Sequence, residues 1–358
     1  MVEGRQLRCL IATGGTVGHV APSLAVAEAL RARGVDVTFA GSPDRVEARL
    51  VPERGYAFDA FRIAGFPRHP GPGLVRALAL SLAAPFACAR ILARRRPDVV
   101  LGGGGYVAGP MVIAAWLRRI PAALTEADAH VGLANRLAAP FARRLFLAYP
   151  AAGAGRKARV VGRPIPATSQ AKPRAEARAA LGVSGDGPVV AVFGGSIGAL
   201  TLNELAVDAW GAAGPTVLHV TGERDVERVR RRVSRPGYHV LPFVDDFGSV
   251  LGAADLIVAR SGGSVWEIAA AGKPAVLVPY PEATGDHQRA NALYFEQAGG
   301  AVVVSDRDAA AQVPPLVEDL LAAPSRLESM GEAMLAVAKP DAAERIADEL
   351  IALATARR

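Results

Sequence analysis

The sequence contains few of the residues that build disulfide frameworks, metal sites or aromatic binding surfaces. Only two cysteines, Cys9 and Cys88, occur in 358 residues, and each lies inside an apolar run. This excludes a disulfide framework and a CxxC metal site, and predicts that both cysteines are core residues. Aromatic residues make up 6% of the chain and are not interleaved with basic ones. Nucleic acid is therefore not an expected partner.

Familiar nucleotide and metal motifs are also missing. No GxGxxG occurs, and the second predicted strand ends at Gly41-Ser42 without an acidic residue for an adenosine ribose, which disfavours a nicotinamide enzyme. The only Gly-Lys pair, Gly272-Lys273, precedes a proline, so a P-loop is absent. Asp245-Asp246 is an adjacent pair without DxD spacing. We expect neither a metal nor an organic cofactor.

The net charge of +7 is distributed unevenly along the chain. Residues 1–163 carry 23 Lys or Arg against 10 Asp or Glu, a balance of +13, whereas the remaining residues carry 18 against 24, a balance of −6. A basic field of this kind suits an anionic partner such as a diphosphate substrate or an anionic membrane surface. The first half of the chain is therefore the expected side for such a partner.

The chain is long enough for two domains. Strand-like and helix-like runs alternate in both halves, which predicts an α/β fold of two Rossmann-like domains with parallel sheets. A stretch rich in Pro, Gly and Ser over about 160–188 marks a linker. We expect domains over 1–163 and 164–340, with a C-terminal helix over 341–358 that packs back on the first.

Three predicted strands run into glycine-rich turns that open helices. The turns are GGTVG at 14–18, GGGG at 102–105 and GGSIG at 194–198. Unpaired amides and a helix dipole make such a turn suited to anions. A tight turn alone explains any single one, but three at equivalent positions in two domains favour a phosphate-bearing ligand.

A further polar group lies within residues 260–291. Gly262-Gly263 opens a helix that carries Glu267, whose carboxylate could accept both hydroxyls of a ribose, or could simply face solvent or cap the helix. Short donors and acceptors then follow an apolar strand within about two helical turns. They suit sugar hydroxyls, with a helix cap as the alternative, and are Asp286, His287, Gln288 and Asn291.

The segments GGTVGHVAPSLAVAEAL, GGGGYVAGP, GGSIGA, FVDDF, RSGGSVWEIAAAGKPAVLVPYP and DHQRANA resemble the MurG family (glycosyltransferase family 28) in order and spacing. The resemblance spans roughly residues 8–355. It implies a GT-B fold, in which two Rossmann-like domains face each other across a cleft. It also implies inverting, metal-independent transfer of N-acetylglucosamine from UDP-N-acetylglucosamine to undecaprenyl-pyrophosphoryl-MurNAc-pentapeptide, which forms lipid II for peptidoglycan, by a peripheral protein at the cytoplasmic face of the cell membrane.

The same resemblance assigns the donor to the C-terminal domain and the acceptor to the N-terminal domain. The implied donor-binding residues are Gly195 and Ser196 at the diphosphate, Phe243 and Val244 at the uracil, Arg260 and Ser261 around the nucleotide, Glu267 at the ribose, and Gln288 and Asn291 at the sugar. The implied acceptor-binding residues are Gly15, Thr16, Gly18, Gly104, Gly105, Tyr106, Glu126, Asp128, Asn135 and Arg163.

His19 is the candidate general base. An inverting transfer needs the acceptor hydroxyl deprotonated as it attacks, and imidazole suits that role near neutral pH. The positive end of the helix that begins here would keep the ring neutral. A structural histidine that hydrogen-bonds the turn is the alternative.

Four positions depart from the family's usual pattern, all on the acceptor side. Val17 stands where glycine is usual, and Ala127-Asp128 replaces a Gln-Asn pair. Arg163 replaces the asparagine of a Gly-Asn-Pro stretch. Two alternatives therefore stay open: a related glycosyltransferase with a different lipid or small-molecule acceptor, and a non-catalytic nucleotide-sugar binding protein.

Residues 74–96 combine an apolar run with a basic end. The uncharged part, 77–89, is 13 residues long and contains Pro85, so it is too short to span a bilayer. It fits either a buried helix with a solvated basic end or an interfacial helix on anionic lipid. The residues expected at that interface are Leu78, Leu82, Phe86, Arg90 and Arg94.

Overall fold

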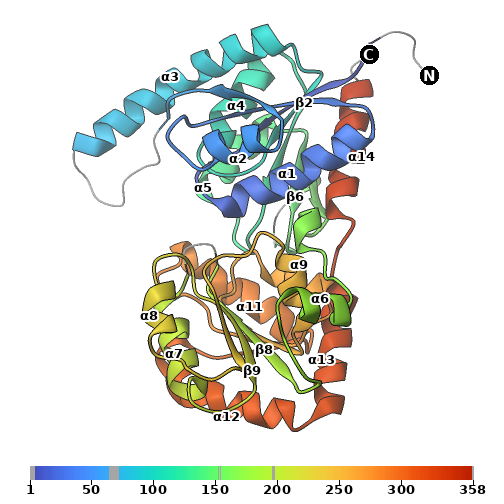
Figure 1. Ribbon diagram of the computed structural model, residues 1–358. Coiled ribbons are helices and arrows are strands. Elements are labelled where there is room, and N and C mark those ends of the chain that lie inside the picture. The colour runs from blue at the N-terminus through green and yellow to red at the C-terminus, as the bar shows by residue number, and fades with distance from the viewer. Residues whose placement is uncertain (1–4, 64–71, 152, 154, 196–197, 357–358) are drawn as a thin grey trace. The chain divides into compact units, whose positions relative to one another are not determined.

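The computed structural model describes residues 5–63, 72–151, 153, 155–195 and 198–356. It divides into two compact units (Figure 1). Unit 1 comprises residues 1–166 and 340–358, and unit 2 comprises residues 167–339. The division after Pro166 lies three residues beyond the boundary expected after residue 163.

Unit 1 is built on a seven-stranded parallel sheet in the order β3-β2-β1-β4-β5-β6-β7. Its central strands are almost completely buried apolar runs, as expected for a sheet covered on both faces. The strands are β1 (Arg8–Ala12), β2 (Asp36–Gly41), β3 (Ala57–Ala60), β4 (Val99–Gly102), β5 (Ala122–Glu126), β6 (Arg144–Leu147) and β7 (Ala158–Val160).

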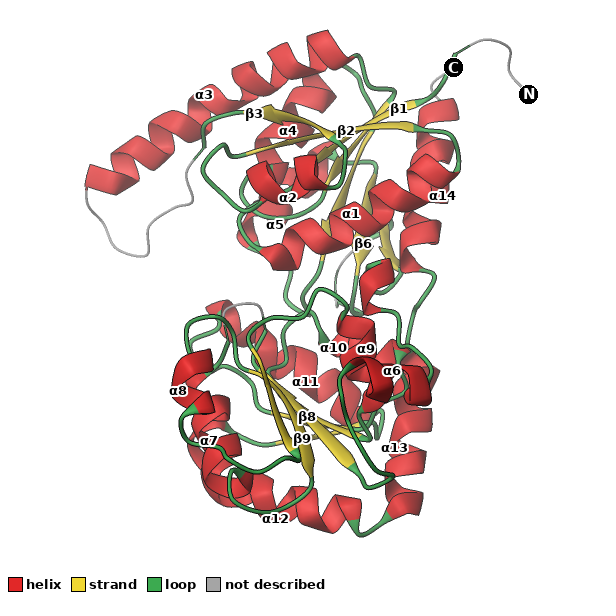
Figure 2. Cartoon of the chain, in the orientation of Figure 1, coloured by secondary structure: helices red, strands yellow, loops and turns green. Residues whose placement is uncertain are grey.

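Helices cover both faces of this sheet (Figure 2). They are α1 (Val17–Ala32), α2 (Glu47–Glu53), α3 (Pro72–Arg95), α4 (Ala108–Leu117), α5 (Leu133–Ala138), the 3-10 turn η1 (Ala139–Phe141) and α14 (Ala342–Thr355). One core contains α1, α2 and α14 against alternate residues of β1, and the other contains α3, α4 and α5. The C-terminal helix belongs to the first core because Ile346 and Leu350 are fully buried there.

Unit 2 has a six-stranded parallel sheet in the order β10-β9-β8-β11-β12-β13. Its strands are β8 (Val189–Phe193), β9 (Thr216–Val220), β10 (Tyr238–Leu241), β11 (Leu256–Ala259), β12 (Ala275–Leu277) and β13 (Ala301–Val303). Its helices are α6 (Arg174–Ala180), α7 (Leu200–Trp210), α8 (Val226–Arg230), α9 (Phe247–Ala253), α10 (Val265–Ala270), α11 (His287–Gln297), α12 (Ala309–Leu321) and α13 (Pro324–Val337), with 3-10 turns η2 (Ala167–Ser169), η3 (Thr284–Asp286) and η4 (Asp306–Asp308).

Both sheets have the same doubly wound order, which confirms the predicted pair of Rossmann-like domains. In each, the chain starts at a central strand, builds outward and then returns to the other side. The return points lie between β1 and β4 in unit 1 and between β8 and β11 in unit 2. Ligands of such sheets bind at the carboxyl ends of these strands. The glycine turns at 14–18, 102–105, 194–198 and 261–263 follow these four strands.

Two composition-based expectations can be compared with the fold directly. Cys9 and Cys88 are free and fully buried, which confirms them as core residues. Burial raises the pKa of the Cys88 thiol to about 12. Within the described ranges, no helix has the length and hydropathy needed to cross a bilayer.

A buried carboxylate that the sequence analysis did not identify holds the first glycine turn. The Glu47 side chain is fully buried at the start of α2. Its Oε2 accepts the N–H of Gly15 at 3.0 Å, and its Oε1 accepts the N–H of Ser42 at 3.0 Å. A Cβ on Gly14 would lie 2.1 Å from Oε1. The amide of Gly15, one of the expected acceptor-binding residues, is thus bonded to Glu47, which joins the β1–α1 turn to the β2–α2 loop by hydrogen bonds to its carboxyl group.

Replacing Glu47 with alanine should destabilise the protein strongly. The change leaves the buried amide of Ser42 and the half-buried amide of Gly15 without acceptors, so we expect the free energy of unfolding to fall by about 3 kcal/mol. Glu53→Ala on the same helix is the control, because that side chain is 51% exposed and pairs with Arg49 at the surface. It should cost at most about 0.5 kcal/mol. Urea denaturation followed by circular dichroism measures both, and equal losses would contradict this role of Glu47.

Candidate functional site

The turns after β1 and β4 are in direct backbone contact. Gly104 and Gly105 have φ of +99° and +73°, which favours glycine. A Cβ on Gly105 would lie 2.2 Å from the Gly14 carbonyl oxygen, and one on Gly104 would lie 2.4 Å from His19 Cδ2. Only glycine permits this approach, which places the His19 ring against the second turn.

The first turn needs glycine at fewer positions than its sequence suggests. Within 14–18 only Gly15 has a positive φ, of +100°. Its ideal Cβ position lies 3.6 Å from Tyr106 Cε1, so the Tyr106 ring lies close to the turn. Val17 is the first residue of α1 and has no positive φ. The backbone therefore accommodates a branched residue where glycine is usual.

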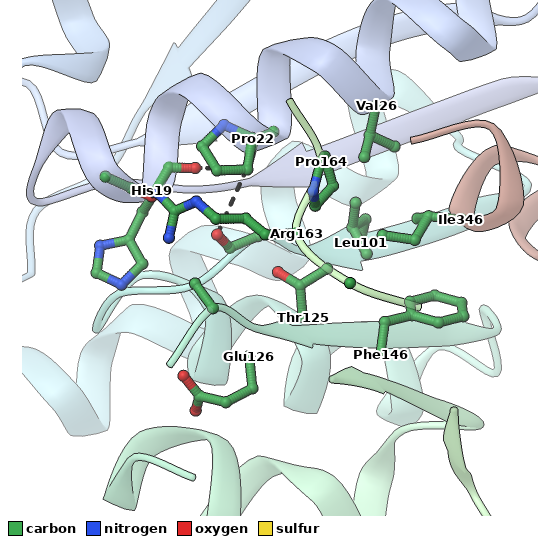
Figure 3. Close-up of a pocket in the computed structure, with 15 residues that line it drawn as sticks. His19, Pro22, Val26, Leu101, Thr125, Glu126, Phe146, Arg163, Pro164 and Ile346 are labelled. Carbon is green, nitrogen blue, oxygen red and sulfur yellow. Dashed lines mark hydrogen bonds between the residues drawn. The ribbon is translucent and has the colours of Figure 1, made fainter. Parts of the chain in front are cut away.

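Hydrogen bonds fix His19 at the start of α1 (Figure 3). Its Nδ1 lies 3.2 Å from Thr16 Oγ1. Its carbonyl oxygen accepts the hydroxyls of Thr13 and Ser23 at 3.1 and 2.9 Å. The ring is half-buried and lines a small pocket that Glu126 and Arg163 also line.

Glu126, the last residue of β5, is a buried carboxylate in this pocket. It accepts the Asn135 side-chain amide at 2.9 Å and the backbone N–H groups of Gly132 at 2.8 Å and Asp128 at 3.4 Å. Asn135 also donates to the Thr125 carbonyl oxygen at 2.9 Å. Burial raises the pKa of Glu126, and the hydrogen bonds oppose that shift. The structure thus places Glu126 and Asn135 in contact, and both are residues predicted on the acceptor side.

Arg163 enters the same pocket from the segment after β7. The residue is 8% exposed, and its Nη2 donates to the Gly18 carbonyl oxygen at 2.6 Å (Figure 3). His19 and the predicted acceptor-side residues therefore all lie in unit 1, at the start of α1, on α5 in the case of Asn135, and in the segments that follow the carboxyl ends of the strands.

The sequence GGSIG after β8 in unit 2 is similar to GGTVG after β1. Ser196, predicted at the diphosphate, lies outside the described residues. Gly195 is exposed with φ of +93°. A Cβ on Gly198 would lie 2.3 Å from the Thr221 carbonyl oxygen, so Gly198 packs closely against the end of β9.

The turn after β11 is joined to α11 by two buried side chains. Ser261 Oγ donates to the Gln288 carbonyl oxygen at 2.8 Å, and Asn291 Nδ2 donates to the Ser261 carbonyl oxygen at 3.1 Å. Ser261 and Asn291 are fully buried, whereas Gln288 is half-buried and its Oε1 accepts the Tyr280 N–H at 2.9 Å. Ser261 and Asn291 thus hold the turn in place, and a sugar contact for Gln288 and Asn291 stays a prediction.

Arg260 is held by the protein itself. The residue is 5% exposed, and its Nη1 lies 2.5 Å from Asp306 Oδ1 and donates to the Val278 and Pro279 carbonyl oxygens. Asp306 and Asp308 form a DxD-spaced pair that the sequence analysis overlooked. Asp308 accepts the Ser305 hydroxyl at 2.5 Å. Both carboxylates therefore contact protein groups.

The remaining predicted donor residues lie on loops or helix starts of unit 2. Glu267 is half-buried in the first turn of α10. Phe243 is 51% exposed and Val244 half-buried in the loop after β10. In the part of the chain that the structure describes, no group of three or more His, Cys, Asp or Glu side chains is arranged to hold a metal ion.

Unit 2 also contains a buried polar network that no sequence pattern predicted. His219, within the apolar strand β9, contacts Tyr238 Oη at 2.7 Å through Nδ1 and Asn203 Oδ1 at 2.9 Å through Nε2. Asn203 Nδ2 donates to the Thr221 carbonyl oxygen and to Asp225, both at 3.0 Å. Burial lowers the pKa of His219 to about 3. The network fixes α7 against the end of β9.

The predicted membrane residues lie on α3, where the structure describes some of their side chains. Phe86 is 74% exposed, and Arg90 is exposed. Arg94 forms an ion pair with the buried Asp59 at 2.5 Å, and Arg95 pairs with the same carboxylate. The side chains of Leu78 and Leu82 lie outside the described residues.

Both halves of the chain match models of one protein family. Residues 9–147 match the glycosyltransferase family 28 N-terminal domain, and residues 189–346 match the family 28 C-terminal domain. The chain is 42% identical over 354 residues to the UDP-N-acetylglucosamine–N-acetylmuramyl-(pentapeptide) pyrophosphoryl-undecaprenol N-acetylglucosamine transferase of Acidithiobacillus ferrooxidans, covering 94% of this chain and 95% of that enzyme. It is 41% identical over 372 residues to the Mycobacterium bovis enzyme of that name, covering 98% and 90%.

Solved structures agree with this match. MurG of Acinetobacter baumannii superposes with a TM-score of 0.78 at 29% identity, covering 97% of this chain and 100% of that one. A UDP-N-acetylglucosamine 2-epimerase, with a TM-score of 0.64 at 14% identity, shares the fold alone. Both family domains, in order, and relatives at 36 to 43% identity over nearly the whole length show that the chain belongs to the MurG enzymes of glycosyltransferase family 28.

Proposed function

We propose that this chain transfers N-acetylglucosamine from UDP-N-acetylglucosamine to undecaprenyl-pyrophosphoryl-MurNAc-pentapeptide, forming lipid II for peptidoglycan. The observation that carries the proposal is the match to relatives named for this reaction, which extends over 93 to 98% of the chain. The geometry supports it, because each unit has glycine turns at the return point of its sheet, where doubly wound sheets bind ligands.

The donor is proposed to bind unit 2. Glu267, in the first turn of α10, would accept the ribose hydroxyls, and the exposed Phe243 ring would lie against the uracil. Gly195 and Ser196 would meet the diphosphate at the turn before α7. Arg260, Ser261 and Asn291 would act by holding the loops around the nucleotide, since their side chains bond to backbone carbonyls.

The acceptor is proposed to bind unit 1, with His19 as general base. When Nδ1 donates to Thr16 Oγ1, Nε2 carries the lone pair that takes the proton from the attacking hydroxyl. That oxygen then bonds to the anomeric carbon as the bond to UDP breaks, which inverts the configuration. Glu126 and Asn135 would bind hydroxyl or amide groups of the acceptor beside it. Gly104, Gly105 and Tyr106 would lie at its diphosphate.

A donor and acceptor panel tests the function. We expect the purified protein to release UDP from UDP-N-acetylglucosamine only when a lipid-linked MurNAc-peptide is present, and to form the disaccharide product. UDP-glucose and UDP-galactose are the donor controls, and a glycolipid without the muramyl group is the acceptor control. Transfer to that glycolipid alone would favour a different acceptor, and no transfer to either acceptor would favour a binding protein.

Replacing His19 with alanine should lower kcat by at least about 100-fold, because general base catalysis contributes that much or more. The KM for UDP-N-acetylglucosamine should stay unchanged, since the proposed donor residues lie in unit 2. Steady-state UDP release measures both constants. Near-normal turnover of a folded His19→Ala protein would show that His19 is structural.

We also propose that unit 1 associates peripherally with the cytoplasmic face of the membrane through α3. The exposed Phe86 ring would insert between the lipid headgroups, and the exposed Arg90 side chain would pair with anionic headgroups. Vesicles with 30% anionic lipid should therefore sediment with the protein at low salt, and less so at high salt or after Phe86→Ser. Arg94 should matter less, since it is bonded to Asp59. No sedimentation with anionic vesicles at low salt would exclude this surface.

A further inference from the structure

The first turn of α1 lacks one of its own hydrogen bonds. In an α-helix, each carbonyl oxygen accepts the N–H of the residue four positions later. The Gly18 carbonyl would therefore pair with residue 22, which is a proline inside this helix. Pro22 has no N–H, and its ring also crowds the Gly18 carbonyl. The turn that carries His19 is thus weakened by its own sequence.

Arg163 supplies the missing donor from a distant part of unit 1. Its Nη2 donates to the Gly18 carbonyl oxygen at 2.6 Å (Figure 3). Arg163 is 8% exposed, and no ion pair with a carboxylate is formed by it among the residues that the structure describes. A buried guanidinium without a counter-ion is costly unless its hydrogen bonds are well used. Satisfying the Gly18 carbonyl is the use that the geometry shows.

The neighbouring carbonyl is held in a similar way. The His19 carbonyl oxygen accepts the hydroxyls of Ser23 and Thr13. The two carbonyls that flank the His19 backbone are thus both bonded by side chains. The position of the imidazole therefore depends on side chains outside the first turn. Arg163 is the most distant of them in the sequence, 145 residues from Gly18.

We propose that Arg163 is a positioning residue, which replaces the hydrogen bond that Pro22 removes and thereby fixes the turn that carries His19. This rests on the proposed function, because the position of His19 matters for turnover only if His19 acts on the acceptor. The rival role is direct binding of an anionic group of the acceptor, in which Pro22 plays no part.

A double-mutant cycle separates the two roles. Arg163→Met keeps the length of the side chain and removes its donors, and should lower kcat at least about tenfold with the donor KM unchanged. Pro22→Ala restores an N–H opposite the Gly18 carbonyl and should remain close to the original kcat. In the double variant, kcat should return to within about threefold of Pro22→Ala, because the helix then satisfies Gly18 itself. Arg163→Lys, which retains a cationic donor, should keep most of the activity.

Two kinetic outcomes would overturn the proposal: an unchanged kcat for Arg163→Met, or the same loss of kcat whether residue 22 is proline or alanine. The second outcome, with a raised acceptor KM, would favour direct binding. If the unchanged protein transfers no sugar at all, the proposed function fails, and amide hydrogen exchange in α1 still tests the positioning. Exchange in the first two turns should accelerate in Arg163→Met and slow again in the double variant, and no acceleration would also overturn the proposal.

Discussion

The pocket of unit 1 that His19, Glu126 and Arg163 line depends on one constraint, the backbone contact between the turns after β1 and β4. Parallel pairing of the two strands brings both turns to one edge of the sheet, and the missing side chain of Gly105 lets the second turn touch the Gly14 backbone. The His19 ring then lies against Gly104, and Tyr106 lies beside Gly15. A methyl group at Gly105 would push the two turns apart, and the His19 and Tyr106 side chains would move with them.

Such close turns leave many backbone groups without partners, and buried side chains satisfy them. Glu47 accepts the amides of two loops, Arg163 donates to a helix carbonyl, and Asn291 donates to the carbonyl of Ser261 in unit 2. Unsatisfied buried groups cost about 1–3 kcal/mol each. These polar residues therefore set the shape of the loops, and their removal changes stability and geometry together. A role in holding a loop and a role in binding a substrate are distinguished by kinetics rather than by position.

Much of the fold followed from the sequence because apolar runs of strand length alternated with helical ones. The glycine turns could be placed at strand ends for the same reason. Glu47 could not be predicted, since its partners Gly15 and Ser42 come close only through parallel pairing of β1 and β2. His219 lies inside an apolar strand and had no local signal. Arg94 is expected at the lipid interface, and its bond to Asp59 had no sequence signal because it depends on a contact between α3 and β3.

The structure bears on three of the four departures from the family's pattern. Val17 lies where the backbone is helical and needs no glycine. Asp128 contributes its backbone N–H to Glu126, a bond that any residue but proline can make. Arg163 bonds to a backbone carbonyl beside His19. None of the four departures removes His19, Glu126 or Asn135, the polar residues proposed to act on or bind the acceptor. The substitutions thus keep the groups that are proposed to meet the acceptor, and Arg163 adds a side-chain hydrogen bond to the first turn of α1.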